Sequence, residues 1–512
     1  MKAFPSAAIF SACLLSVALT GCNSSDDDDS TSESTETTTT SSSSTTTTTT
    51  TSTEYGTYSI ADSEQESCYD NTLEMTCSTD TSYFYGQDAQ NIGSVNAQSY
   101  TDNGDDTVTD NITGIMWTQS PDLDGIGNDD GYITSDDKLS SDNAYTACED
   151  LELAGYTDWQ LPNIKQLYSL MNFKGMDPEN SGDVTTYLVP FIDATVYDPS
   201  TGAINTQGEY AAFHFAYGTT DDERIIDSQY ATTSKYYNDE GTEMMFGVNF
   251  ADGRIKGYTE EFLPGQDKTY FVMCMRNNTS YATNDFELTD DETTVTDNAT
   301  GLMWARDDSG EDYSTGFDYT ALDWTDSDDN GLLVSDESDD DEMRGAMSWQ
   351  AALDYAQEMN EAEYLGYSDW RLPTIKELHS ITEYSESYVG AAIDTDYFYA
   401  TPITNENGDE DYAFYWSSTT HATDGAIYGS DNVYGGQTDD YGDAGSYVAF
   451  GRALGYDSDG ASDENDWVDV HGAGAQRSEM KEWDGEDYSG GSGPQYDAVR
   501  FYHYVRLVRD AE

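Results

Sequence analysis

The chain has 512 residues, and its 100 Asp and Glu against 20 Lys and Arg give a formal net charge of −80. A field of this sign repels nucleic acids and anionic lipid headgroups, so we expect neither as a partner. The same carboxylates keep a protein soluble, as in secreted proteins from salty habitats, and they also attract divalent cations. The composition is compatible with both explanations.

The N-terminus predicts export and lipid attachment. Lys2 provides a positively charged start, and the apolar stretch at 7–19 is too short to span a bilayer. Leu-Thr-Gly-Cys at 19–22 resembles the lipobox of bacterial lipoproteins, in which the thiol is acylated and the chain is cut before the cysteine. We predict a signal peptide at 1–21 and a lipid anchor in the membrane on Cys22. An ordinary signal peptide with a chance cysteine is the alternative.

The residues after the cysteine indicate a location and a spacer. Asn23 is not the Asp that favours inner-membrane retention in enterobacteria, so we expect a lipid-anchored protein at the outer membrane or cell surface. Residues 22–53 are almost all Ser, Thr and Asp, which cannot form a hydrophobic core. They predict a disordered stalk.

Beyond the stalk, the sequence contains two copies of one domain. VTDNITGIMW at 108–117 returns as VTDNATGLMW at 295–304, and GYTDWQLPNIKQLYSL at 155–170 returns as GYSDWRLPTIKELHSI at 366–381. Self-similarity of this length is the signature of a duplicated unit. The repeat predicts three segments: a first domain with its lead-in at 54–278, a linker at 279–292, and a second domain at 293–510.

Both copies predict the same order of elements. A strand with an Asn-Xaa-Thr-Gly turn comes first, and an acidic loop follows it. Ser141 and Ser348 are candidate N-caps of the next helix. Asn163 and Thr374 are candidate N-caps of a second helix after the WQLP or WRLP motif. Short strands then lead to a closing strand, FVMCMR or YVRLVR, which we expect to pair with the first strand where the domain ends meet.

The cysteines can be assigned by aligning the two copies. Four remain once the signal peptide and Cys22 are set aside, and pairing is expected in an exported protein. Cys148 aligns with Ala356, and Cys274 aligns with Leu507, so both thiols are absent together from the second copy. Two cysteines lost together are most simply explained as a bonded pair. We predict the disulfides Cys148–Cys274 and Cys68–Cys77.

The motifs TDNATGLMW, GYSDWRLPTIKEL, YWSST and YVRLVR, in this order, resemble the Lcl C-terminal domain, a family named after the Legionella collagen-like adhesin. WRLPTIKEL is also similar to a block of formylglycine-generating-enzyme-like proteins, whose fold is related to C-type lectins. The resemblance covers nearly all of 54–510. It implies an α+β fold of two tandem C-type-lectin-like domains, each with two helices on small antiparallel sheets and long acidic loops. It also implies adhesion and polysaccharide binding at the cell surface.

The chain departs from the namesake of this family in two respects. It has no collagen-like Gly-X-Y tract, so trimerisation by that route is excluded. It has no basic patch either, and sulfated glycans are bound by Lys and Arg. We therefore do not expect glycosaminoglycan binding, whereas neutral glycans and protein surfaces stay candidate ligands.

Aromatic residues could belong to the core or to a binding face. Trp159 and Trp370 each precede a Leu-Pro that begins a helix, and we interpret them as core residues rather than sugar-stacking platforms. The same interpretation applies to Trp117, Trp304 and Trp416. Tyrosine offers rigid contact area with a polar tip, so the loop tyrosines are the better candidates for a binding face. These are Tyr230, Tyr236, Tyr237, Tyr428, Tyr434 and Tyr441.

The acidic loop of the second copy fits the calcium-loop pattern D-x-[DN]-x-[DN]-G with a Glu near its end. Gly331 would make the sharp turn of such a loop. The predicted ligands of a Ca²⁺ ion are the side chains of Asp326, Asp328, Asn330 and Glu337 and the carbonyl group of Leu332. A solvated acidic turn is the alternative.

The first copy repeats part of this pattern. Asn128, Asp130 and Asp137 keep the register of the calcium loop. Ile126 stands where the first ligand is expected, so Asp124 would have to substitute through a longer loop. We therefore predict a second, less complete Ca²⁺ site here.

Catalytic motifs are missing from the sequence. None of the five His recurs at the same motif position in both copies, and no GxSxG, HExxH or phosphate-binding loop is present. His379 replaces Tyr168 of the first copy, which indicates a surface or packing position. We expect a non-enzymatic surface lipoprotein that adheres or binds a ligand, with glycans and envelope proteins among the candidates. A structural or assembly component of the envelope is the second hypothesis, and an enzyme related to the formylglycine-generating fold is the third. The sequence does not indicate an oligomeric state.

Overall fold

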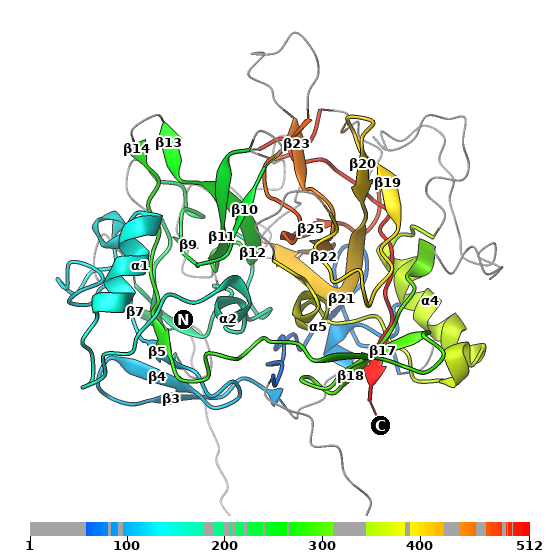
Figure 1. Ribbon diagram of the computed structural model, residues 1–512, viewed down its shortest axis with the longest axis horizontal. Coiled ribbons are helices and arrows are strands. Elements are labelled where there is room, and N and C mark those ends of the chain that lie inside the picture. The colour runs from blue at the N-terminus through cyan, green and yellow to red at the C-terminus, as the bar shows by residue number, and fades with distance from the viewer. Residues whose placement is uncertain are drawn as a thin grey trace, which may run out of the picture. The chain divides into compact units, whose positions relative to one another are not determined.

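The structure is a computed structural model, drawn in Figure 1. It describes residues 58–79, 83–90, 96–178, 189–197, 204–206, 211–218, 223–238, 241–263, 266–310, 345–384, 390–423, 441–456, 467–483, 488, 490–493 and 495–511. The predicted signal peptide, Cys22 and the stalk lie outside these residues. In the described part of the chain, no helix has the length and apolar character that crossing a membrane requires.

Each copy begins with a hairpin whose second strand pairs with the closing strand of the same copy. This confirms the predicted meeting of the domain ends, and all pairings in these sheets are antiparallel. The sheet of the first copy has the order β15-β5-β4-β3, and that of the second copy has the order β16-β17-β18-β26. Their bounds are β3 (Tyr100–Asp102), β4 (Thr107–Asp110), β5 (Met116–Thr118), β15 (Met275–Arg276), β16 (Phe286–Leu288), β17 (Thr294–Asp297), β18 (Leu302–Ala305) and β26 (Val508–Asp510).

The turn of each hairpin is held by a buried aspartate at the end of its first strand. Asp110 accepts a hydrogen bond from the backbone N–H of Ile112 at 2.8 Å and another from the hydroxyl of Thr113 at 2.8 Å. Asp297 accepts the equivalent hydroxyl bond from Thr300 at 2.9 Å. Aspartate side chains favour turns because they bond to the backbone just after them. The repeated Asp-Asn-Xaa-Thr-Gly words therefore specify the same turn twice.

Four α-helices are described, two in each copy. They are α1 (Ser141–Asp150), α2 (Ile164–Tyr168), α4 (Trp349–Glu361) and α5 (Ile375–Ser380). The predicted caps of the second helices are confirmed, since Asn163 and Thr374 each form a reciprocal capping box. Ser348 caps α4 through its side chain. The N-cap of α1 is Ser140, so the prediction of Ser141 was wrong by one residue.

A larger antiparallel sheet follows in each copy, with the order β10-β11-β12 in the first and β21-β22-β25 in the second. Strand β9 also pairs with β11, and β12 packs beside β25, so these sheets meet where the copies join (Figure 1). The bounds are β9 (Gln229–Tyr230), β10 (Lys235–Tyr237), β11 (Glu243–Asn249), β12 (Arg254–Thr259), β21 (Phe414–Thr423), β22 (Tyr441–Ala449) and β25 (Gln476–Met480).

Smaller elements complete the architecture. Strands β6 (Ala194–Tyr197), β7 (Ile204–Thr206) and β8 (Phe213–Phe215) form a three-stranded sheet in which β6 and β8 are parallel. Two-stranded sheets are β1 (Cys68–Tyr69) with β2 (Glu74–Met75), β13 (Glu261–Leu263) with β14 (Gln266–Asp267), β19 (Pro402–Thr404) with β20 (Glu410–Tyr412), and β23 (Leu454–Tyr456) with β24 (Trp467–Asp469). Short 3-10 turns are η1 (Asp88–Gln90), η3 (Ser135–Asp137) and η5 (Tyr364–Gly366).

The described part is thus a mixed α/β structure of small, mostly antiparallel sheets with few helices, arranged as two tandem domains. One hydrophobic core extends through both copies, from Trp117 and Phe246 to Trp304 and Tyr415. A smaller apolar cluster lies in each copy, and the one in the second copy includes Phe84 of the lead-in. The predicted core tryptophans are buried, with relative exposures of 0 to 3% for Trp117, Trp159, Trp304, Trp370 and Trp416.

Both predicted disulfides are present. Cys148 on α1 is bonded to Cys274, next to β15, across a sequence separation of 126 residues. In the second copy, Ala356 and Leu507 stand at these positions and pack in one apolar cluster. The Cys68–Cys77 bond closes the small loop that contains β1 and β2. The copies therefore attach the same helix to the same closing segment in two ways.

Candidate functional site

The lead-in to the first copy contacts both copies. On the first copy, Gln98 donates from its amide to the carbonyl oxygen of Met171 at 2.8 Å. On the second copy, Gln65 exchanges two hydrogen bonds with the backbone of Thr420, at 2.7 and 2.9 Å. The aromatic ring of Tyr69 lies against Gly442, where a Cβ atom would come within 2.2 Å of it. The lead-in predicted at the start of the first domain is thus also part of the second.

The two second helices contact each other through equivalent residues. Lys165 of α2 donates to the carbonyl oxygen of Ser380 at 2.8 Å, and Lys376 of α5 donates to the carbonyl oxygen of Ser169 at 2.8 Å. The rings of Tyr168 and His379, which are also equivalent, lie 4.2 Å apart. Reciprocal contacts of this kind define a two-fold-like junction. Of the two positions predicted for His379, surface or packing, the structure shows the packing one.

Burial shifts the pKa values of the ionisable side chains at this junction. It lowers the pKa of Lys165 and of Lys376 to about 8, so both ammonium groups stay protonated at neutral pH. Nearby, burial raises the pKa of Asp88 to about 7, and the Thr419 hydroxyl donates to this carboxylate. The junction is consequently a polar layer inside the shared core.

A second ionic group crosses the junction between the larger sheets. Asp177 of the first copy is bonded to Arg254 on β12 and lies 3.4 Å from the ring nitrogen Nε2 of His421 on β21. Arg254 also donates to the hydroxyl of Ser478 on β25 at 2.8 Å. The His421 ring stacks on Phe191 with centroids 5.0 Å apart. These contacts link the two copies. The Arg254 side chain is 12% exposed, so there is no open cleft beside it.

The first acidic loop closes on its own backbone. Asp137 is buried, and its carboxylate accepts the backbone N–H groups of Asn128 at 2.9 Å and Thr134 at 2.7 Å. Asp122, which the calcium pattern did not include, accepts the N–H groups of Asp130 at 3.1 Å and Gly131 at 2.8 Å. Burial raises the pKa of Asp137, and the charges of Asp122 and Asp130 contribute. The loop is thus organised by two buried carboxylates.

The predicted ligands of the first loop are either exposed or engaged with the backbone of the loop. Asp124 is exposed, and the side chains of Asn128 and Asp130 each accept a bond from the backbone two residues further on, at 3.2 and 3.0 Å. Among the described residues, no three His, Cys, Asp or Glu side chains form a group that could hold a metal ion. The ligands predicted in the second copy, Asp326, Asp328, Asn330, Leu332 and Glu337, lie outside the described residues.

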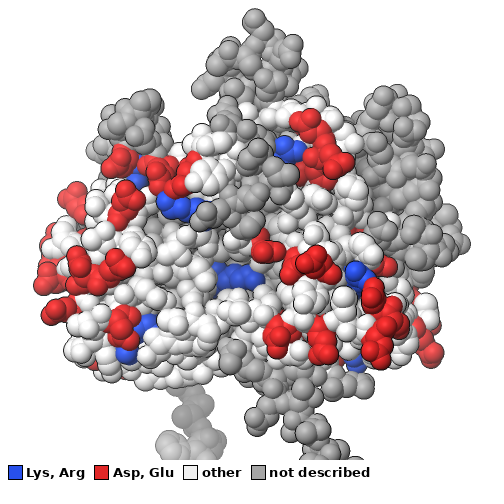
Figure 2. All heavy atoms as spheres, viewed as in Figure 1, with Lys and Arg blue, Asp and Glu red and all other residues white. Residues whose placement is uncertain are grey.

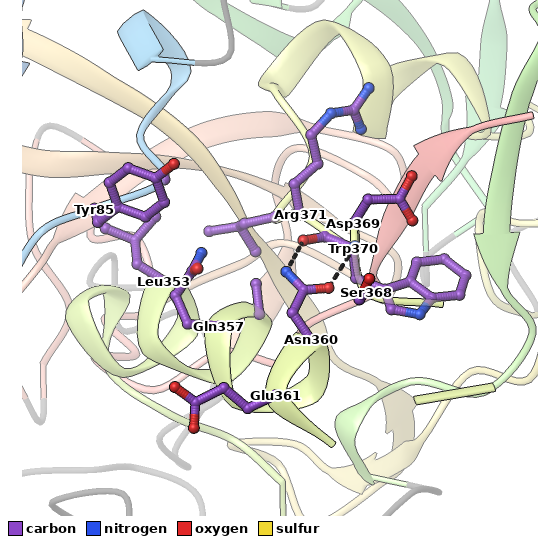
Figure 3. A pocket seen from close by; sticks show the side chains of 12 residues that line it. Tyr85, Leu353, Gln357, Asn360, Glu361, Ser368, Asp369, Trp370 and Arg371 are labelled. Carbon is purple, nitrogen blue, oxygen red and sulfur yellow. Dashed lines mark hydrogen bonds between the residues drawn. The ribbon is translucent and has the colours of Figure 1, made fainter. Parts of the chain in front are cut away.

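A pocket of about 450 Å³ lies between α4 and the lead-in (Figure 3). Leu353, Ala356, Gln357 and Asn360 occupy one face of α4, at the helical spacing i, i+3, i+4 and i+7. Figure 3 shows Tyr85 of the lead-in across from Leu353 and Gln357. The volume falls within the range of roughly 300–1,000 Å³ that is typical of small-molecule sites.

The segment before α5 forms another wall of the pocket. The amide of Asn360 accepts the N–H of Trp370 at 2.6 Å and donates to its carbonyl oxygen at 2.7 Å. Asp369 is paired with Arg509 at 2.7 Å, which lowers the pKa of Asp369. Arg371 is paired with Glu377 at 2.7 Å and with Asp510 at 3.0 Å. The charges of this wall are therefore engaged within the protein.

The first copy has no counterpart of this lead-in cover among the residues that the structure describes. Tyr145 of α1 stands at the position of Leu353 and is 50% exposed, whereas Leu353 is 1% exposed. Glu149, at the position of Gln357, is also exposed. The pocket consequently belongs to the second copy, because the lead-in crosses to that copy.

The tyrosines proposed for a binding face do not form one. Tyr230 and Tyr236 are buried, at 1% and 3% exposure, so their prediction was wrong. Both lie on strands, Tyr230 on β9 and Tyr236 on β10, and their side chains pack in the shared core. Tyr237 is half-buried, Tyr428 and Tyr434 lie outside the described residues, and the side chain of Tyr441 is not described. The exposed tyrosines of the described part are Tyr83, Tyr132, Tyr145, Tyr156, Tyr399 and Tyr496.

The pocket residues were not predicted from the sequence. The polar Gln357 and Asn360 interrupt the apolar face of α4, and this interruption is a signal that could have been used. Tyr85 and Gly86 carry no such signal, because they approach α4 only through the path of the lead-in. The acidic character predicted from composition is evident on the face in Figure 2, where Asp and Glu are widespread and Lys and Arg occupy a few separated spots.

Comparison with known protein families matches the chain twice to one family model. The model of the Lcl C-terminal domain matches residues 106–276 and 293–449. Neither the curated proteins nor the solved structures give a match. The second match ends at residue 449, although β26 still closes the sheet of that copy.

Proposed function

Because the chain belongs to the Lcl C-terminal domain family, present twice, we propose that it is a surface lipoprotein that adheres to or binds a ligand. The two matched domains are the observation that carries this proposal, since the family is consistent with adhesin-like and envelope proteins. The ligand would be neutral or cationic, because a net charge of −80 repels anions. Attachment through Cys22 to the outer membrane would expose both domains on one stalk.

We propose that the protein acts by binding rather than by catalysis. The histidines, which are the commonest general bases, are engaged in packing contacts. His503 stacks on Trp416 at 3.8 Å, and His471 pairs with Asp497 at 2.8 Å. Each copy has two helices beside small antiparallel sheets, and this arrangement supports the C-type-lectin-like fold as part of the proposal.

We further propose that the acidic loop of the second copy binds Ca²⁺, with Glu337 as a bidentate ligand. The first loop as it stands offers two carboxylates that already accept backbone N–H groups, so we do not extend the proposal to it. Thermal unfolding under calcium titration tests this claim. We expect calcium to raise the Tm of the wild type and of the control Asp124→Asn, and to leave Glu337→Gln unchanged. An unchanged wild-type Tm would overturn the calcium site.

A glycan array probed with the full-length protein tests the binding proposal. We expect binding to neutral glycans that depends on calcium and is lost in EDTA. Binding restricted to sulfated glycans would contradict the charge argument, and silence on all glycans together with a stable envelope partner in pull-down would favour a structural component of the envelope.

A further inference from the structure

Three side chains with complementary chemistry meet where the two copies join. Lys165 of α2 donates from its side-chain nitrogen Nζ to Oδ1 of Asn284 at 3.0 Å, and this oxygen is one covalent bond away from the side-chain carbon Cγ. Asn284 precedes β16, and its Nδ2 donates to the carboxylate of Asp297 on β17 at 2.8 Å. An amine of the first copy thus contacts an amide whose other end is bonded to a carboxylate of the second copy.

The carboxylate of Asp297 is held in a fixed position. It is buried, and it also accepts the backbone N–H groups of Asp285 at 2.9 Å and Ala299 at 3.0 Å. The hydroxyl of Thr300 donates to it at 2.9 Å. A carboxylate that is fixed beside an amide nitrogen can take up a proton and return it to that nitrogen.

The surroundings of Lys165 favour the form of its side chain that can react. Burial lowers the pKa of Lys165 to about 8, and the charges of Asp297 and Glu383 oppose this shift. The ammonium form prevails at neutral pH, and a minor population has the free amine, which is a nucleophile. Lys165 and Asn284 are each half-buried, so a small molecule released between them can reach the solvent.

The equivalent lysine of the second copy offers an internal comparison. Burial also lowers the pKa of Lys376 to about 8. The register of β3 on β4 and of β16 on β17 makes Gln98 the equivalent of Asn284. Gln98 donates to the carbonyl oxygen of Met171 at 2.8 Å and accepts the side-chain amide of Asn172 at 3.1 Å. A similar amine therefore stands in the second copy, but the corresponding amide is engaged with other groups.

We propose that Lys165 and Asn284 form an isopeptide bond that crosslinks the two copies. The nitrogen Nζ of the free amine bonds to Cγ of Asn284, the bond between Cγ and Nδ2 breaks, and one molecule of ammonia leaves. Asp297 takes a proton from Nζ and delivers it to the departing Nδ2, so the carboxylate is regenerated. The step needs no oxidant, reductant or cofactor. The hydrogen bonds in the structure are those of the groups before they react.

The fold is what brings these groups together. Lys165 and Asn284 are separated by 119 residues in the sequence, so the bond forms after the two copies have packed on each other. Holding two reacting groups in contact is a large source of rate acceleration. The crosslink would join the copies covalently, and an amide bond, unlike the Cys148–Cys274 disulfide, withstands reduction.

Peptide mapping of the full-length protein tests this inference. Trypsin does not cut after an acylated lysine, so the crosslink should join the peptide 139–174 to the peptide 277–306 after reduction of the disulfides. We expect the mass of this pair to equal the sum of the two peptides less one ammonia molecule. Fragment spectra should place the bond between Lys165 and Asn284. Ordinary cleavage after Lys376 is the internal control.

Four variants assign the roles of the groups. Lys165→Arg keeps a positive charge and Asn284→Ala removes the amide, and each should abolish the crosslinked pair. Asp297→Asn removes the proton carrier and should reduce the crosslinked fraction at least ~10-fold. Asp110→Asn is the matched control, because Asp110 holds the equivalent turn of the first copy, and it should crosslink like the wild type. Circular dichroism and the Tm of each variant report whether it is folded.

Three outcomes would overturn the proposal or part of it. Folded wild-type protein that yields the peptides 139–165 and 277–306 separately, at their unmodified masses, would exclude the bond. A crosslinked pair that persists in Asn284→Ala would exclude Asn284 as the partner. Equal losses in Asp297→Asn and Asp110→Asn would overturn the role of Asp297. Each of these results leaves the proposed adhesive function standing, because ligand binding is measured separately.

Discussion

The two copies solve one structural problem differently. The first copy joins its long helix to its closing segment by the Cys148–Cys274 disulfide, and the second copy does so through an apolar cluster that contains Ala356 and Leu507. The second copy gains a cover from the lead-in, which turns the same helix face into a pocket. One copy thus has a covalent bond, and the other has the lead-in packed on its helix. The two copies share a scaffold and differ in the contacts added to it.

Removing the disulfide that distinguishes the first copy should have the largest effect on the free energy of unfolding. Cys148→Ala with Cys274→Ala opens a loop with a separation of 126 residues, and we expect a loss of about 2–5 kcal/mol in the free energy of unfolding. Cys148→Ala with Cys274→Leu installs the pair of the second copy and should recover part of the loss through apolar packing. Guanidinium unfolding measures both. Equal stability of both variants and the wild type would contradict the role of the bond.

The reciprocal lysine contacts should have the next largest effect. Lys165→Met or Lys376→Met leaves a buried carbonyl of the other copy without its charged donor, and we expect each variant to lose about 1.5–3 kcal/mol. The effects of the double variant should not be additive, because both residues act at one junction. Lys174→Met is the control, since its pairs with Glu64 and Glu66 are partly exposed and worth about 0–1 kcal/mol. If Lys174→Met lost as much free energy of unfolding as the other variants, the stabilising role of the lysine contacts at the junction would be refuted.

Most of the sensitivity of the folded protein to acid should come from histidines of the second copy. Burial lowers the pKa of His471 to about 4 and also lowers the pKa values of His379 and His503, all in the second copy. A histidine with a lowered pKa gives full stability above its unfolded pKa of about 6.5 and loses it as the pH falls toward the folded pKa. We expect a loss of up to about 1.4 kcal/mol per pH unit for each such residue, between pH 6.5 and 4.

Urea unfolding at several pH values measures this trend. His503→Phe keeps the stacking on Trp416 and should flatten the pH dependence. His214→Phe, in the first copy, is the control and should flatten it less because His214 is only half-buried. The pKa of Asp88, raised to about 7, acts in the opposite direction, so Asp88→Asn should steepen the loss on acidification. If the free energy of unfolding did not change between pH 6.5 and 4, the proposed role of the buried histidines would be disproved.

The smallest expected effect concerns a glycine in the lead-in. Gly86 has a φ of 93°, and a Cβ atom there would lie 3.4 Å from the amide nitrogen of Gln357. Gly86→Ala should cost about 1 kcal/mol through backbone strain and should narrow the pocket. Gly104→Ala has a comparable φ of 72° and open space around it, so it is the control and should lose a similar amount of stability. Thermal unfolding measures both variants, and an unchanged Tm in both would contradict the backbone strain.

Much of the scaffold could be predicted because the repeat supplied an internal alignment. It identified both disulfides, the paired first and closing strands and the caps Asn163 and Thr374. The alignment of the copies also marks a position at which the charge differs. In the structure Arg371 pairs with Glu377, and the first copy replaces both of them with glutamine, Gln160 and Gln166.

Contacts between segments distant in sequence could not be predicted. Gln65 bonds to Thr420, and Tyr85 faces α4, yet neither contact leaves a periodic pattern in the sequence. The prediction for Tyr230 and Tyr236 failed because they lie on the short strands β9 and β10, with their side chains buried in the core. In the first acidic loop, the sequence did not indicate that the carboxylates of Asp122 and Asp137 accept backbone N–H groups.

Differential scanning calorimetry tests most directly whether the two copies form one folded unit. A core that extends through both copies and the reciprocal lysine contacts predict a single transition with equal calorimetric and van't Hoff enthalpies. The Cys148→Ala, Cys274→Leu variant should shift the midpoint of that transition without splitting it. Two separate transitions, of which only one responds to loss of the disulfide, would contradict the account.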